Sequence, residues 1–204
     1  MAPLKRRGAV AELTLNRPEA RNALSAELMG VLESRLAEIR DDRDVKVVVL
    51  AAAGPVFCSG HDLKEMRAER DRDRYKSLFA QCSRLMTAIV RLPQPVIAAV
   101  QGVATAAGCQ LVASCDLAVA GASARFATPG VNIGLFCSTP MVALTRNLAR
   151  KHAMEMLLTG YMVSAEAAAQ IGLINRVVAD DRLAQEVAAL AEGIAAKSGH
   201  VVSI

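Results

Sequence analysis

Two short segments of the sequence have the composition of strand-to-helix turns that can bind an oxygen atom carrying negative charge. Phe57–Met66 follows an apolar run, turns at Gly60 and enters a helical pattern, and Gly102–Leu111 does the same with side chains small enough for close ligand approach. At such a turn the first N–H groups of the helix lack an intrahelical acceptor, and the helix dipole lies behind them. Two turns that faced each other would form an oxyanion hole, although each one alone also fits an ordinary strand-to-helix connection.

Four side chains in or near these segments carry groups that take part in acid-base or nucleophilic chemistry elsewhere. His61 titrates near neutral pH. Asp62 stands where a helix begins, a position at which aspartate commonly caps the helix. Cys109 and Cys137 are expected to be core thiols rather than nucleophiles, because free cysteine is among the most buried residue types. Neither segment matches G-x-G-x-x-G or a Walker loop, which argues against nucleotide-phosphate binding of those kinds.

The elements around these segments alternate between strands and helices, which predicts an α/β fold with mainly parallel strands. Val45–Ala52 and Val96–Val100 are apolar throughout, as strands buried on both faces are. Residues 126–140, with their prolines and glycines, are expected to form loops. The other predicted strands are Ala9–Leu15, Leu117–Ala120 and Ile174–Val178, and the predicted helices are one capped by Ser25 and ended by Asp41–Asp44, then Ser77–Val90, Lys151–Thr159, Ser164–Gln170 and Arg182–Lys197.

A charged segment, Lys64–Lys76, separates the first turn from the helix at Ser77–Val90. It holds six basic and four acidic residues, and Arg67 and Asp71 have the i,i+4 spacing of a helical ion pair. We expect a solvated helix here that continues into the amphipathic one.

Composition excludes several classes of function. The chain has 204 residues, 53% of them hydrophobic, and a net charge of +4, which is typical of one folded domain and not of a disordered chain. Aromatic residues make up 3% and tryptophan is absent, so we expect no stacking platform for nucleic-acid bases. The mild positive charge suits a small anionic ligand.

Five cysteines without C-x-x-C spacing and only three histidines argue against a structural zinc site. We therefore expect no metal and reduced, buried thiols. No apolar run approaches the roughly 20 residues of a membrane-spanning helix. These features predict a soluble intracellular protein with no membrane span and no nucleic-acid partner.

The order of several motifs resembles the enoyl-CoA hydratase/isomerase (crotonase) superfamily. The motifs are Asn16-Arg17-Pro18, Arg21-Asn22-Ala23-Leu24, the F-x-x-G-x-D-L pattern within Phe57–Met66, Gly102 through Cys115-Asp116, Phe126-Ala127-Thr128-Pro129, and Leu158–Gly160 with Ala165–Val178. The stretches A-T-A-A-G-C-Q-L and A-T-P-G-V-N-I-G-L-F-C-S-T-P are most similar to the family's mitochondrial enoyl-CoA hydratase domain-containing branch and its bacterial relatives. The resemblance implies an α/β fold, a crotonase-type spiral of ββα units, in a single domain over residues 1–204 with its core at about 9–196.

The resemblance also implies a ligand, an acyl-CoA thioester. Coenzyme A enters as part of the substrate, and no separate cofactor is expected. The backbone N–H groups of His61 and Ala107 are expected to hold the thioester oxygen. Ala107 stands where many relatives have glycine, which matters only if its φ is positive. Asp62, Leu63 and Lys64 are expected to contact coenzyme A or the substrate, although Asp62 also fits a helix cap and Lys64 a solvated side chain.

The two glutamates that hydratases of this family use fall on Gln110 and Gly130. A glutamine can orient a water molecule but cannot take up or release a proton near neutral pH, and glycine has no side chain. A positioned acid or base contributes about 10²–10⁴ in rate, so we expect weak or altered hydratase activity. Asn132 and Ser138 lie on the loop that lines the acyl pocket in relatives, and both offer polar contacts to a substrate.

Two functions remain open. One is an enzyme of fatty acid metabolism that acts on acyl-CoA, as a weak hydratase or isomerase or in another reaction through a thioester enolate. The other is a non-catalytic acyl-CoA-binding, regulatory or assembly subunit in lipid metabolism.

The C-terminal end differs from the family pattern, in which further helices follow the one at Arg182–Lys197, cover the active site and build trimers. We expect the C-terminal part of the domain to be truncated and apolar surface to be exposed where those helices dock. A homotrimer or dimer of trimers is expected if the short end allows it. The family points to the mitochondrial matrix for a eukaryotic protein and to the cytoplasm for a bacterial one.

Overall fold

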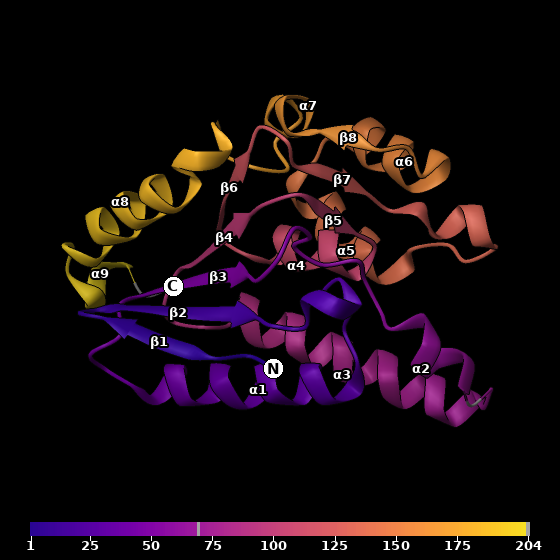
Figure 1. The fold of residues 1–204 in the computed structure, drawn as a ribbon, viewed down its shortest axis with the longest axis horizontal. Helices are drawn as coiled ribbons and strands as arrows, with labels where there is room; N and C mark the ends of the chain where they lie inside the picture. Colours follow the sequence, from indigo (N-terminus) through magenta and orange to yellow (C-terminus); the bar gives the residue numbers. More distant parts are fainter. Residues whose placement is uncertain (69, 203–204) are drawn as a thin grey trace.

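The computed structural model describes residues 1–68 and 70–202, which form two β-sheets with helices around them (Figure 1). The larger sheet has six strands in the order β1-β2-β3-β4-β6-β9, and its pairings are parallel except for the β1–β2 hairpin. The smaller sheet has the order β5-β7-β8. The strands span Leu4–Arg7 (β1), Val10–Leu15 (β2), Val47–Ala52 (β3), Val96–Val100 (β4), Val103–Thr105 (β5), Leu117–Gly121 (β6), Arg125–Ala127 (β7), Val163–Ser164 (β8) and Arg176–Val178 (β9).

The helices lie on both sides of the large sheet. In Figure 1, α1 and α3 lie below it and α8 lies on its other side. The helices span Ala26–Asp41 (α1), Leu63–Ala68 (α2), Arg72–Val90 (α3), Ala107–Ser114 (α4), Ser138–Asn147 (α5), Arg150–Thr159 (α6), Ala165–Gln170 (α7), Leu183–Ala195 (α8) and Gly199–Val202 (α9), with 3₁₀ turns at Pro18–Ala20 (η1), Pro129–Ile133 (η2) and Asp180–Arg182 (η3).

Strands β3 and β4 separate two hydrophobic cores, because their residues are apolar on both faces. In β3, Val48 and Leu50 face the main core, where α1, α3 and α4 pack, whereas Val47 and Val49 face a smaller core under α8. All five residues of β4 are buried. The prediction that these two strands are buried on both faces is confirmed. Each Val or Leu side chain removed from water in this way contributes about 1.5–3 kcal/mol.

Most predicted elements are confirmed in type and position, as is the mainly parallel sheet. Ser25 caps α1 as expected, because its Oγ accepts a hydrogen bond from the Leu28 N–H at 3.1 Å. The sequence patterns missed β1, β5 and β7, since strands of three or four residues are too short to show a periodicity. The prediction that residues 126–140 are all loop is wrong, because they hold part of β7, η2 and the start of α5.

The charged segment Lys64–Lys76 is not one helix, and the prediction that it continues without a break is wrong. Its residues belong to α2 and α3, with Asp71 between them. Asp71 caps α3, because its Oδ1 accepts hydrogen bonds from two backbone N–H groups, each at 2.9 Å. A carboxylate used as a cap lies outside both helices, which removes the i,i+4 relation to Arg67. Glu69, in the same segment, lies outside the described residues.

Candidate active site

The ends of β3 and β4 continue into two turns that lie side by side. The Cys58 N–H donates to the Val103 carbonyl at 3.1 Å, and the Thr105 N–H donates to the Cys58 carbonyl at 2.9 Å. Because these two segments run parallel, as β3 and β4 do, both chains reach their helices at the same edge of the large sheet. The structure therefore brings together the two segments that the sequence singled out.

Glycine at two positions permits this close approach. Gly60 has a φ of +96°, and a Cβ there would lie 2.9 Å from the Ala106 Cβ and 3.4 Å from the Ala107 nitrogen. A Cβ on Gly108 would collide with the Cys58 carbonyl. Any larger residue at either position would push the two turns apart. The predicted turn at Gly60 is confirmed, and close packing explains why glycine is needed there.

The backbone N–H groups of His61 and Ala107 lie on these adjacent turns. On one side of the first turn, the Leu24 N–H donates to the Gly60 carbonyl at 2.8 Å and the Asp62 N–H donates to the Leu24 carbonyl at 3.1 Å. Successive N–H groups of an extended segment point to opposite sides, so the His61 N–H is directed away from Leu24. Ala107 is the first residue of α4, whose N–H has no intrahelical acceptor. Among residues 1–68 and 70–202, no hydrogen bond is formed by either N–H, which leaves two donors for a ligand.

Backbone strain falls on Ala106 rather than on Ala107. Ala106 has φ 51° and ψ −120°, a region that residues with a Cβ rarely adopt, whereas Ala107 is helical. The sequence left open a positive φ at Ala107, whereas in the structure the positive φ occurs one residue earlier, at Ala106. Such a conformation costs on the order of 1–3 kcal/mol and is maintained by the surrounding packing.

Relief of this strain is measurable. Ala106→Gly is expected to raise the free energy of unfolding by about 1 kcal/mol, because the strain relieved exceeds the chain entropy that glycine adds. Ala107→Gly, at a helical position next to it, is expected to lower that free energy by about 1 kcal/mol. Urea unfolding of both variants tests the pair, and equal destabilisation by the two would contradict the assignment of strain to Ala106.

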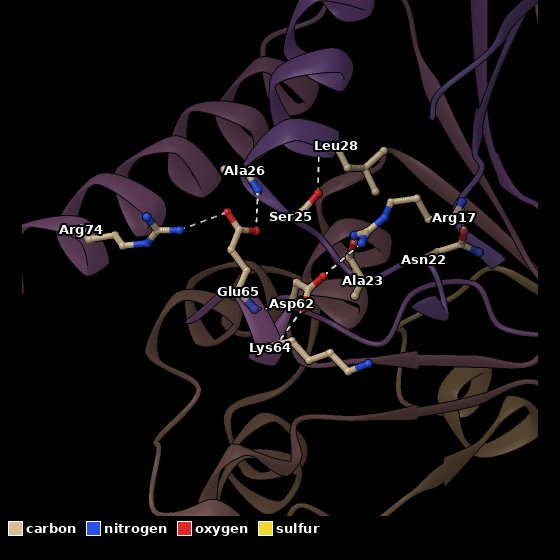
Figure 2. A network of polar contacts seen from close by, with 10 residues as sticks. All are labelled: Arg17, Asn22, Ala23, Ser25, Ala26, Leu28, Asp62, Lys64, Glu65 and Arg74. Carbon is tan, nitrogen blue, oxygen red and sulfur yellow. Dashed lines mark hydrogen bonds and ion pairs between the residues drawn. The ribbon is translucent and has the colours of Figure 1, made fainter. Parts of the chain in front are cut away.

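Asp62 caps α2 and forms an ion pair with Arg17. Of the two roles expected for Asp62, the helix cap is confirmed. Its Oδ1 accepts hydrogen bonds from the N–H groups of Lys64 at 3.1 Å and Glu65 at 3.3 Å (Figure 2). Its Oδ2 lies 3.1 Å from Nη2 of Arg17. Burial alone would raise the pKa of Asp62, but these hydrogen bonds and the Arg17 charge outweigh it and hold the pKa below its ordinary value. The carboxyl is therefore ionised and engaged, which makes it a positioning group and not a proton donor.

The loop before α1 ties the first turn to the rest of the fold, a role that the sequence motifs did not reveal. Asn22 is fully buried with φ 52°. Its Nδ2 donates to the carbonyls of Ala53 at 2.8 Å and Val56 at 2.7 Å, and its Oδ1 accepts from the Arg17 N–H at 2.8 Å. The Arg17 guanidinium also donates to the Ala23 carbonyl at 2.9 Å. The chain just before the first turn is thus held in place by side-chain hydrogen bonds.

A second connection joins α2 to the start of α1 and to α3. The Glu65 Oε2 accepts a hydrogen bond from the Ala26 N–H at 3.0 Å, and its Oε1 lies 3.7 Å from Nη2 of Arg74 (Figure 2). Together with the Asp62 cap, this contact orients the short helix that follows the His61 amide.

His61 is half-buried, and its imidazole packs against α3. Its ring meets Phe79 of α3 edge to face, with 5.4 Å between ring centroids and 89° between planes. Both ring nitrogens are buried, and within the described part of the chain neither makes a hydrogen bond. Burial lowers the pKa of His61, while the nearby Leu24 backbone and the Glu65 carboxylate oppose the shift in part. The imidazole is therefore neutral at physiological pH.

This imidazole makes stability depend on pH. The unfolded chain has an ordinary histidine pKa near 6.5, so as the pH falls the unfolded state binds the proton first. The free energy of unfolding is then expected to decrease by up to about 1.4 kcal/mol per pH unit below about pH 6.5 and to recover as the pH rises.

His61→Leu is expected to flatten this dependence in urea titrations between pH 5 and 7. His152→Leu, at an exposed position, is the control and should leave the slope unchanged. An unaltered slope in His61→Leu would show that another group titrates.

Gln110 and Gly130, the positions where the resemblance places the family glutamates, offer no acid or base. Gln110 lies one helical turn after Ala107, is 5% exposed, and its Oε1 is buried without a hydrogen-bond partner among the residues described. Gly130 is the second residue of η2. A Cβ at this position would collide with the Leu135 carbonyl and lie 2.8 Å from the Cys137 sulfur. The φ of Gly130 is not positive, so packing rather than backbone conformation excludes a side chain at this position.

The cysteines near the turns are core thiols, as predicted. Cys58, Cys109 and Cys137 are buried and reduced. Burial raises the pKa of the Cys58 and Cys109 thiols to about 12 and raises that of Cys137. A thiol with so high a pKa carries almost no thiolate at neutral pH and is a poor nucleophile.

Accessible residues surround the two turns. Leu63 is 46% exposed and the side chain of Lys64 points away from the polar network in Figure 2. Asn132 and Ser138 are exposed on and just after η2. One face of α3 is open and shallow and carries Tyr75, Lys76 and the His61 neighbour Phe79, together with Arg72, Ala80 and Ser83.

Over residues 1–68 and 70–202, no group of three or more His, Cys, Asp or Glu side chains is placed to hold a metal ion. In that same part of the chain no helix is long and apolar enough to cross a membrane.

Comparison with known proteins gives a consistent result. A family model described as "Enoyl-CoA hydratase/isomerase" matches residues 5–204. The chain is 50% identical over 195 residues to human enoyl-CoA hydratase domain-containing protein 3, mitochondrial, covering 96% of this chain and 64% of that protein. The Danio rerio protein of the same name is 48% identical over 200 residues, covering 98% and 69%. The chain thus spans about two thirds of the length of these curated relatives.

Solved structures agree with the fold. A crystal structure of enoyl-CoA hydratase from Mycobacterium smegmatis superposes with a TM-score of 0.97 at 55% identity, covering 99% of this chain and 79% of that chain. The crystal structure of the human domain-containing protein 3 superposes with a TM-score of 0.95 at 48% identity, covering 98% and 79%. The expected α/β fold of the crotonase type is confirmed.

Proposed function

The chain belongs to the enoyl-CoA hydratase/isomerase family, and we propose that it binds acyl-CoA thioesters and polarises the thioester carbonyl between the N–H groups of His61 and Ala107. The observation that carries the proposal is the contact of the two turns, which puts two unpaired backbone donors on neighbouring segments. Donors arranged in this way stabilise a developing oxyanion by about 3–4 kcal/mol each. Because the donors are backbone groups, the proposal does not depend on the side chains at either position.

We assign the coenzyme A portion to the surface beside the His61 turn and α3, on the basis of charge and exposure. Leu63 and Lys64 are exposed next to the His61 turn, and Arg72 and Lys76 lie on the open face of α3. Cationic side chains suit the phosphates of coenzyme A. Asp62 acts by capping α2 and holding the turn, and no cofactor beyond the coenzyme A of the substrate is required.

Hydration is weak in this proposal, because neither glutamate position can transfer a proton. A buried carboxamide at Gln110 can hold a water molecule or a substrate oxygen, and its unpartnered Oε1 is ready to accept a hydrogen bond. The imidazole of His61 is neutral and both its ring nitrogens are buried, so in this proposal it does not replace the missing base. Each absent acid or base removes about 10²–10⁴ in rate.

A second function is favoured by the packing at Gly130. Because the Leu135 carbonyl fills the space of a side chain, the site is built around the absence of the second glutamate. Such a site fits an acyl-CoA-binding, regulatory or assembly subunit that uses the two donors for affinity alone.

Catalytic tests separate these functions. Hydration of a short 2-enoyl-CoA is expected to be at least about 10³-fold slower than in a two-glutamate relative. Gln110→Glu is expected to raise the rate, because it restores one proton-transfer group near donors that are already in place. Gln170→Glu makes the same change at an exposed position on α7 and should have no effect. Gly130→Glu is not a useful partner, since the side chain would displace the loop at Leu135.

Calorimetry with several acyl-CoA chain lengths accompanies the assay. No binding at millimolar concentration would overturn the proposal. High activity in the unmodified protein that survives Gln110→Ala would show that another residue is the base. Binding without activity in any variant would support the second function.

The proposal includes self-association as a homotrimer or a dimer of trimers. Large apolar side chains are exposed on and around η2 and α6. They are contiguous, because a Cβ on Gly160 would lie 3.1 Å from Asn132 and 3.2 Å from Val131. The exposed residues are Ile133, Leu135, Phe136, Leu158, Tyr161 and Met162. For a eukaryotic protein we place it in the mitochondrial matrix, and for a bacterial one in the cytoplasm, in fatty acid metabolism.

Introducing charged side chains at these exposed apolar residues tests whether they mediate self-association. Leu158→Glu combined with Ile133→Glu is expected to convert the oligomer to monomers in sedimentation velocity, because burying two unpaired carboxylates in an interface is costly. Val90→Glu, at an exposed apolar position at the end of α3, is the control and should leave the assembly intact. A monomeric unmodified protein would contradict this part of the proposal.

A further inference from the structure

A cavity lies between α8 and the face of the large sheet that is turned away from α1 and α3. Its volume is about 490 Å³, which is within the range of small-molecule sites. Residues of β2, β3 and β4 line it on one side and residues of α8 on the other. Figure 1 shows how these elements are arranged. We call it the α8 cavity; its apolar lining includes Val10, Val49, Ala51, Ala99, Ala184 and Ala188.

The α8 cavity is open because small residues face each other across it. α8 packs on the sheet through Leu183 and Val187, which belong to the smaller core. Beside this contact α8 presents Ala184 and Ala188, which are four residues apart and so share one face of the helix. The sheet presents Ala51 opposite them. Alanine side chains end at Cβ, so they line the space without filling it.

The charged groups of the α8 cavity are mostly acidic. Glu12, Asp180 and Glu192 line it together with one cation, Arg7, so three carboxylates against one guanidinium leave a net charge of −2. Glu12 comes from the face of β2 that points to α8, since Ala11 and Leu13 on either side of it face the main core.

Glu12 is the half-buried carboxylate of the cavity, whereas Asp180 and Glu192 are exposed. Its side chain accepts one long hydrogen bond, from Thr14 Oγ1 at 3.5 Å, and the ion pairs of the described residues do not include it. Asp180, by contrast, accepts hydrogen bonds from the N–H and Oγ of Ser123 at 3.1 and 3.0 Å. A half-buried carboxylate beside an apolar space favours a cation as its partner.

We propose that the α8 cavity binds a small molecule with an apolar body and a cationic head group, with Glu12 as the partner of the cation. The alanines and valines would enclose the apolar body, while the acidic rim excludes anions. Acyl-CoA, which carries several negative charges, does not match this rim. The α8 cavity is therefore distinct from the proposed acyl-CoA site, which lies with α3 and α4 on the other face of the sheet.

The test uses octyltrimethylammonium below its micelle concentration, with octanoate as the matched anion of the same chain. Calorimetry on the unmodified protein is expected to show saturable binding of the ammonium at least about tenfold tighter than that of octanoate. Glu12→Gln is expected to reduce this preference by about threefold or more, because the cation loses its partner.

Ala188→Leu fills the α8 cavity and is expected to weaken ammonium binding by about tenfold or more. Ala189→Leu, one position along on the exposed side of α8, is the control and should bind as the unmodified protein does. If Ala188→Leu does not fold, judged by its thermal melt, Ala51→Val fills the same space from β3. Neither filling variant should change acyl-CoA binding, so failure here is distinguishable from failure of the proposed function.

Three results would overturn the proposal. One is equal binding of the ammonium and octanoate, and another is ammonium binding that persists in the filled variants. The third is a change of oligomeric state in the filled variants, which would assign the α8 cavity to contact with a second copy of the chain.

Discussion

The close contact between two strand-to-helix turns is the constraint on which the rest of the site depends. Gly60 lies against Ala106 and Ala107, and Gly108 lies against the Cys58 carbonyl, with no room for a Cβ at either glycine. The parallel pairing of Cys58 with Ala104 sets the register between the turns. Because β3 and β4 are neighbours in a parallel sheet, both turns emerge at one edge, and the N–H groups of His61 and Ala107 lie on adjacent segments.

The two turns are held in place by different means. The first is fixed by polar contacts, in which Arg17, Asn22 and Asp62 join the loop before α1, the end of β3 and the start of α2. The second has fewer side-chain contacts, among them the hydrogen bond that Thr105 Oγ1 donates to the Ser59 carbonyl at 3.2 Å, and packing holds Ala106 in a backbone conformation that suits glycine. Stored strain at this point is compatible with a rigid site, because the surrounding main core is close-packed and cannot relax easily.

In the proposed site, two backbone donors stand without a neighbouring acid or base. A backbone arrangement that binds a thioester oxygen would depend on the fold alone, so it would persist when side chains change. Proton transfer in the proposal would need side chains at Gln110 and Gly130, and here one position holds a buried amide while the other has no space for any side chain. If the proposal holds, affinity for a thioester and the ability to hydrate it are separable, since the first would reside in the backbone and the second in side chains.

The sequence by itself determined the fold class, the buried strands β3 and β4, the Ser25 cap and the positions of the two turns, because apolar runs, cap residues and turn glycines act over a few neighbouring residues. The motif resemblance added the family and the residues aligned with its glutamates. Only the tertiary structure decided that Ala106 and not Ala107 carries the strain, that the His61 ring packs against Phe79, that Asp71 separates α2 from α3, and that Leu135 blocks Gly130. Each of these depends on segments distant in sequence or on the conformation that packing imposes, and a local pattern carries no information about how such segments meet.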